Sequence, residues 1–75
     1  MKTLEEFIEL FKEQFEEPEG IEASTAFHDL DEYSSLIALS IIAMIDEEFD
    51  VTVKGDDMRS AVTVEDLYNI VKSKA

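Results

Sequence analysis

The chain has no cysteine, no tryptophan, one histidine, one proline and two glycines among its 75 residues. Without cysteine it cannot form disulfides or thiolate zinc sites, which is typical of a reducing, cytoplasmic compartment. A single histidine and the lack of a metal-ligand pattern predict no catalytic residues and no metal site, so the protein is expected not to be an enzyme. No apolar run is long enough for a signal peptide or a membrane span, and no membrane contact is expected.

Positive charge is also scarce. Six basic residues oppose 19 acidic ones, which gives a formal net charge of −13. Such a chain repels nucleic-acid phosphates and anionic lipids, so no nucleic acid is expected as a partner. The same charge attracts proteins with basic surfaces. The length predicts one domain over residues 1–75 with a small core.

Apolar residues with helical spacing predict a first helix over residues 3–15. Thr3 and Glu6 have the spacing of a capping box, so the helix is expected to begin there. Residues 16–20 are expected to end this helix, because Pro18 cannot continue an ordinary helix and the glutamates beside it repel each other. A long connection follows.

The longest apolar pattern covers residues 36–49 and predicts a central helix. Residues 51–53 alternate like a strand but have no pairing partner, so an extended link is expected. A short helical turn is expected around Met58, and Thr63 with Asp66 predicts a capped final helix. The fold class is therefore all-α, a small four-helix bundle with three longer helices and one short one. The predicted core is Leu4, Phe7, Ile8, Phe11, Leu36, Leu39, Ile42, Ile45, Phe49, Leu67, Ile70 and Val71.

Two serines, Ser34 and Ser35, stand at the entrance of the central helix. A serine at this place can cap the helix through its hydroxyl or can carry a covalent group. The residues alone leave both roles open. The single histidine, His28, has no nucleophile beside it in the sequence and is expected to be structural. Met44 and Met58 are expected either in the core or along a pliable cavity.

The order of helices, the long loop and several short motifs resemble the acyl carrier proteins and the related peptidyl carriers. The family pattern is an Asp-Leu pair, an Asp-Ser-Leu motif, a Glu-Glu-Phe end to the central helix and a Thr-Val pair that opens the last helix. The corresponding positions here are 29–30, 34–36, 47–49 and 63–64. The resemblance covers nearly the whole chain.

The resemblance implies that Ser35 carries a 4'-phosphopantetheine arm derived from coenzyme A, with Ser34 as the less favoured alternative. It also implies a phosphopantetheinyl transferase as a partner, together with acyl-loading, condensing and tailoring enzymes that have basic docking surfaces. The expected function is to carry acyl intermediates as thioesters in fatty acid, polyketide or related lipid biosynthesis, as a monomer. The alternatives are a peptidyl or aminoacyl carrier and an unmodified acidic helical module that binds proteins.

The chain departs from the family pattern around the serine. Ser34 replaces the usual aspartate, and Ile37 and Ser40 stand at positions after Ser35 where fatty-acid carriers often place acids. This predicts a specialised carrier whose partners meet an apolar patch of Ile37, Ile41 and Met44, flanked by acidic residues. The residues expected to bind partners are Asp29, Asp31, Glu32, Leu36, Ile37, Ser40, Ile41, Met44, Asp46 and Glu47.

Overall fold

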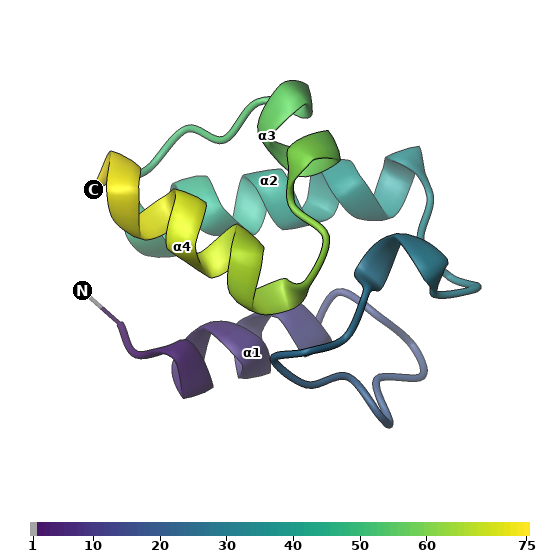
Figure 1. Cartoon of the computed structure of the whole chain (residues 1–75). Coiled ribbons are helices and arrows are strands. Elements are labelled where there is room, and N and C mark those ends of the chain that lie inside the picture. The colour runs from purple at the N-terminus through teal and green to yellow at the C-terminus, as the bar shows by residue number, and fades with distance from the viewer. Residues whose placement is uncertain (1) are drawn as a thin grey trace.

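The computed structural model describes residues 2–75 and is helical, as predicted (Figure 1). Within these residues there is no strand, and only an isolated antiparallel bridge joins Ala26 to Thr63. The elements are α1 (Leu4–Lys12), a short 3-10 helix η1 (Phe27–Asp29), α2 (Ser35–Phe49), α3 (Gly55–Ser60) and α4 (Val64–Lys74).

Helix α1 begins as its capping box predicts. The Thr3 N–H donates to Glu6 Oε1 at 2.8 Å, and the Glu6 N–H donates to Thr3 Oγ1 at 3.2 Å. The predicted end at Phe15 is wrong, because the helix ends at Lys12. The N–H of Phe15 instead donates to the carbonyl of Lys12 at 3.1 Å, in a tight turn that directs Phe15 into the core. Phe15 is therefore buried in the core although it lies outside the helix.

The second half of the chain follows the sequence-based expectations closely. Residues 51–53 form an extended link in which Val51 and Val53 are buried. Met58 is buried within α3, the expected short turn. The capping box of α4 is also confirmed, with the Asp66 N–H donating to Thr63 Oγ1 at 3.1 Å and the Thr63 N–H donating to Asp66 Oδ2 at 3.0 Å.

The core is one cluster to which all four α-helices and the long loop contribute. A cluster of aromatic rings lies at its centre, with Phe11 in contact with both Phe7 and Phe27. The buried members are Phe7, Phe11, Phe15, Ile21, Phe27, Ile41, Met44, Ile45, Val51, Val53, Met58, Ala61, Val64, Leu67 and Val71.

Two predicted core residues on α2 are wrong. Leu36 is 76% exposed and Leu39 is 62% exposed, whereas Ile41 and Ile45 are fully buried. The helix is apolar on more than one side, and the side that faces the rest of the protein is not the stripe chosen from periodicity. The other predicted core residues are buried or partly buried.

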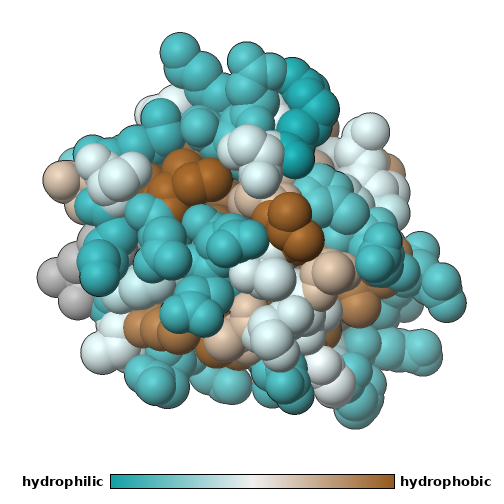
Figure 2. Space-filling model, in the orientation of Figure 1, coloured by the Kyte–Doolittle hydropathy of each residue, from teal (hydrophilic) through white to brown (hydrophobic). Residues whose placement is uncertain are grey.

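Helix α1 packs against α2 and α4, and α3 packs against α4. Figure 1 shows the start of α2 and the long loop of residues 13–34 at one end of the molecule, with the chain termini at the other. In the space-filling view, hydrophilic residues dominate the surface and separate small apolar patches (Figure 2). No helix in the described chain is long and apolar enough to cross a membrane.

Candidate functional site

Ser34 and Ser35, at the start of α2, differ in their backbone conformation and in their hydrogen bonds. Ser34 is the N-cap residue, with an extended backbone (φ −154°, ψ 176°), and its Oγ accepts a hydrogen bond from the Ile37 N–H at 3.3 Å. Ser35 is the first helical residue and is exposed. Within the described part of the chain, its hydroxyl makes no hydrogen bond that meets normal geometry. Ser35 therefore presents a free hydroxyl to solvent.

The surroundings of Ser35 favour an attached anion. An α-helix N-terminus carries a partial positive charge and N–H groups without intrahelical acceptors. The first turn of α2 has no acidic residue, because the first carboxylate of this helix is Asp46. Ser34 thus caps the helix without placing a negative charge next to Ser35.

A cavity of about 380 Å³ opens beside Ser35, between α2 and α3. Its surface is mainly apolar, with Leu39 and Ile42 contributed by α2 and Met58 by α3. The full lining is His28, Tyr33, Ser34, Ser35, Ala38, Leu39, Ile42, Gly55, Met58 and Arg59. Of the two methionines considered for a pliable cavity, Met58 lines this one, whereas Met44 lines a separate surface pocket with Ser40 and Glu47.

His28 connects the loop before α2 to the end of α3. Its Nε2 lies 2.9 Å from the carbonyl oxygen of Met58 and 3.0 Å from that of Ala61. Because carbonyl oxygens only accept, Nε2 must carry the proton. The imidazole also stacks on Phe27, with 4.5 Å between ring centroids, and meets the Tyr33 ring edge-on at 4.9 Å. These contacts agree with the structural role expected for His28, and they hold α3 beside the cavity.

Tyr33 directly precedes the two serines in the sequence. Its ring meets Phe27 edge-on, with 5.4 Å between centroids, and forms part of the cavity wall. Burial of this side chain raises the pKa of the Tyr33 phenol above its ordinary value, so the phenol is neutral at physiological pH. The role of Tyr33 in the cavity could not be found from periodicity, because it lies in a loop.

The structure divides the ten residues expected to bind partners into three groups. Asp29, Asp31, Leu36, Ser40, Asp46 and Glu47 are exposed, whereas Glu32 and Ile37 are partly buried. Ile41 and Met44 are buried in the core, with 0% and 7% of their surfaces exposed. The expected apolar patch of Ile37, Ile41 and Met44 is therefore wrong. The apolar side chains exposed near Ser35 are instead Leu36 and Leu39.

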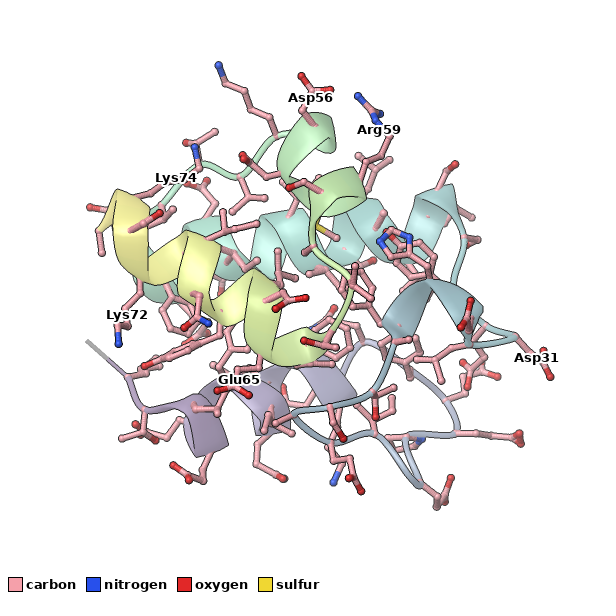
Figure 3. The ribbon with its side chains drawn as sticks, viewed as in Figure 1. Asp31, Asp56, Arg59, Glu65, Lys72 and Lys74 are labelled. Carbon is pink, nitrogen blue, oxygen red and sulfur yellow. The ribbon has the colours of Figure 1, made fainter. Side chains whose placement is uncertain are left out.

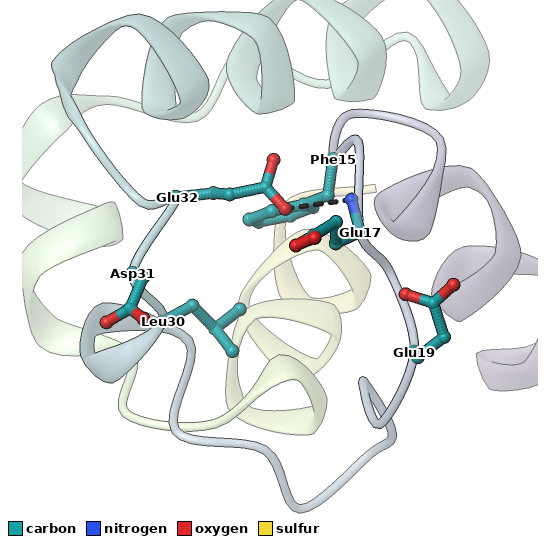
Figure 4. Close-up of a pocket in the computed structure, with 6 residues that line it drawn as sticks. All are labelled: Phe15, Glu17, Glu19, Leu30, Asp31 and Glu32. Carbon is teal, nitrogen blue, oxygen red and sulfur yellow. Dashed lines mark hydrogen bonds between the residues drawn. The ribbon is translucent and has the colours of Figure 1, made fainter.

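Glu32 has a structural task that its sequence position did not reveal. Its two carboxylate oxygens accept hydrogen bonds from the N–H groups of Glu16 and Glu17, each at 2.8 Å. Figure 4 shows this carboxylate directed at the loop after α1, over a separate pocket of about 320 Å³. The bonds join two parts of the long loop, and Glu32 lines that pocket and not the Ser35 cavity.

The fold is a small helical bundle in which two serines, Ser34 and Ser35, stand at the start of α2 beside an apolar cavity. The family model described as the phosphopantetheine attachment site matches residues 5–71. The chain therefore belongs to the phosphopantetheine-binding carrier proteins, whose domains bear covalently attached 4'-phosphopantetheine. Searches of curated proteins and of solved structures found no match.

The residues present fit this group. The Ser35 hydroxyl is free and exposed, no carboxylate lies in the first turn of α2, and an apolar cavity opens beside the hydroxyl. Carrier domains of this kind are themselves non-catalytic, are modified by phosphopantetheinyl transferases and interact with the enzymes that use them.

Proposed function

We propose that this protein carries acyl intermediates on a phosphopantetheine arm attached to Ser35, in fatty acid, polyketide or related lipid biosynthesis. When bound, the arm supplies a terminal thiol that holds the cargo as a thioester. The observation that carries the proposal is the free Ser35 hydroxyl at the first residue of α2, beside an apolar cavity. The cytoplasmic location and the monomeric state stay predictions.

Helix capping favours Ser35 over Ser34 as the attachment residue. The Ser34 hydroxyl already accepts the Ile37 N–H, and a bulky diester there would disturb the cap. Losing a serine N-cap costs about 0.5–2 kcal/mol. Modification of Ser35 leaves that hydrogen bond intact, because the Ser35 hydroxyl takes no part in it.

The cavity favours an acyl cargo over an aminoacyl one. Leu39, Ile42 and Met58 give it an apolar surface, and no carboxylate lines it that could bind the ammonium group of an aminoacyl thioester. A peptidyl or aminoacyl carrier is therefore the second choice. An unmodified acidic binding module is disfavoured, because the family match spans the attachment site.

The surface around Ser35 suits a partner whose docking face is apolar at its centre and basic at its rim. Leu39 lies one helical turn after Ser35 and is 62% exposed, so an enzyme that reaches the Ser35 hydroxyl must also cover Leu39. Leu36 extends this apolar surface. Exposed carboxylates at Asp29, Asp31, Asp46 and Glu47 lie at a greater distance along the chain and suit a basic rim on the partner.

Intact-protein mass spectrometry tests the attachment residue. The apo protein is incubated with coenzyme A, Mg²⁺ and a promiscuous phosphopantetheinyl transferase, alongside Ser35→Ala and Ser34→Ala. We expect one added phosphopantetheine on the wild type and on Ser34→Ala, and none on Ser35→Ala. Modification that persists in Ser35→Ala but is lost in Ser34→Ala would move the site to Ser34. No modification of the wild type, under conditions that modify a control carrier, would overturn the proposed function.

A further inference from the structure

We propose that Arg59 is a positioning residue that pairs with the phosphodiester linking the arm to Ser35. The inference rests on the proposed function and adds a specific residue to it. The chain has 19 acidic residues, but none of them lines the cavity beside Ser35. Among the described residues that line this cavity, Arg59 has the one permanently charged side chain.

The other basic residues belong to other parts of the surface. Lys2 pairs with Glu48, Lys12 with Glu9 and Lys74 with Asp57. Lys72 lies over the Tyr68 ring, and Lys54 precedes α3 and is not part of the cavity wall. Arg59 is also the only arginine in the chain. An anion attached to Ser35 therefore meets one guanidinium across the cavity and no competing carboxylate on the wall.

The present partner of Arg59 is easily exchanged. Its guanidinium bonds to the carboxylate of Asp56, three residues earlier on α3. Both side chains are largely exposed, at 73% and 89%, and such surface pairs contribute little to stability. Figure 3 shows the two side chains together at the outer side of α3, above α2. Because this ion pair is local and solvated, Arg59 can turn to a second anion at small cost.

The chemistry of the two groups is complementary. A phosphodiester carries one negative charge and two free oxygens, and a planar guanidinium can donate to both oxygens at once. One of the Arg59 terminal nitrogens lies over Gly55, within 3.5 Å of where a β-carbon would stand, and Gly55 is itself part of the cavity wall. One terminal nitrogen of the guanidinium thus lies beside the cavity wall, while the side chain as a whole stays 73% exposed. His28 does not compete for the anion through Nε2, which is bound to two carbonyls.

A thermodynamic cycle between the phosphodiester and Arg59 tests the pairing. Melting temperatures are measured for the apo and holo forms of the wild type, Arg59→Gln, Arg59→Lys and Lys54→Gln at low ionic strength. The quantity of interest is the holo-minus-apo difference for each protein. We expect this difference to fall by about 2–5 °C in Arg59→Gln and to recover in part in Arg59→Lys. Lys54→Gln removes the same charge outside the cavity and should leave the difference close to that of the wild type.

The outcomes separate this inference from the function on which it rests. Mass spectrometry first reports whether Ser35 takes up the arm, and failure of uptake in the wild type overturns both. If uptake occurs but Arg59→Gln and Lys54→Gln change the holo-minus-apo difference equally, the pairing is wrong while the carrier function stands. The side-chain Nε–H signal of Arg59 in NMR spectra gives a second readout, and it should shift on conversion from apo to holo.

Discussion

Ser34 and Ser35 are identical side chains on neighbouring residues, and their positions relative to the first turn of α2 separate their chemistry. The backbone of Ser34 is extended, which turns its hydroxyl back to the Ile37 N–H. Ser35 has entered the helix and is exposed at the edge of the cavity. A one-residue shift along the chain therefore decides which hydroxyl is available to an enzyme.

Leu39 and Ile41 provide a matched test of which side of α2 holds the core. Ile41→Ala should lower the free energy of unfolding by about 2–5 kcal/mol, because Ile41 is fully buried. Leu39→Ala removes a side chain that is 62% exposed, and it should cost less than about 1 kcal/mol. Urea unfolding of the two variants measures both values. A larger loss for Leu39→Ala than for Ile41→Ala would contradict the observed orientation of the helix.

At the scale of elements, amphipathic pattern explains which predictions from the sequence succeeded. Helix α1 has Phe7 and Phe11 on one side and carboxylates on the other, so its buried face was predictable. Helix α2 has no charged residue before Asp46, so periodicity alone could not choose between the side of Leu39 and the side of Ile41. The choice is made by tertiary packing against α1 and the loop, which local sequence does not encode.

The candidate site shows the same division between local and long-range information. Ser35 follows from its position at the start of an apolar helix and from the family resemblance, and its modification stays a prediction. Arg59 and His28 could not be assigned to the cavity, because their nearness to Ser35 depends on how α3 and η1 are placed. The bonds from Glu32 to the Glu16 and Glu17 amides span 15 and 16 residues and have no short-range signal.

The helix caps predict how stability depends on pH. Hydrogen bonds from backbone N–H groups lower the pKa of Glu6, Asp57 and Asp66 below their ordinary values, with the bonds from Thr3, Lys54 and Thr63 respectively as the largest cause. A carboxyl whose pKa is lower in the folded state stabilises the fold above its unfolded pKa, and this contribution is lost as pH falls through the folded pKa. The caps should therefore weaken below about pH 4.

The variant Asp66→Asn isolates this effect in one cap. Asparagine keeps an oxygen that can accept from Thr63 and Val62, but it does not titrate. Between about pH 5 and pH 3, the wild type should lose more free energy of unfolding than Asp66→Asn. All other carboxyl groups are common to both proteins, so the difference between the two curves reports the cap. Parallel curves would show that the Asp66 cap does not contribute to acid unfolding.

At the scale of the whole molecule, the net charge of −13 opposes the compact state. The chain fits within principal extents of 29 × 23 × 19 Å, so most of its carboxylates lie within about one Debye length (about 30 Å at 0.01 M) of one another in dilute buffer. The four ion pairs between described residues offset only part of this repulsion, and the side chains in them are partly or largely exposed.

Salt should therefore stabilise the protein. Raising the ionic strength from about 0.01 M to about 0.15 M shortens the Debye length from about 30 Å to about 8 Å, and the melting temperature should rise by several degrees. Mg²⁺ should act more strongly than Na⁺ at equal ionic strength, because a divalent ion bridges neighbouring carboxylates. Thermal melts followed by circular dichroism measure both effects. A melting temperature that is insensitive to both salts would show that charge repulsion is not a significant cost in this fold.

The N-terminal segment and the last helix lie together, and the Tyr68 hydroxyl donates to the carbonyl of Lys2 at 2.7 Å. The start of α2 lies at the opposite end of the molecule (Figure 1). A tag or linker added at either end of the chain would thus leave Ser35 accessible. Immobilised on a sensor surface through such a tag, the protein would face partner enzymes in solution with Ser35 outward, and its binding kinetics could be measured without steric blockage.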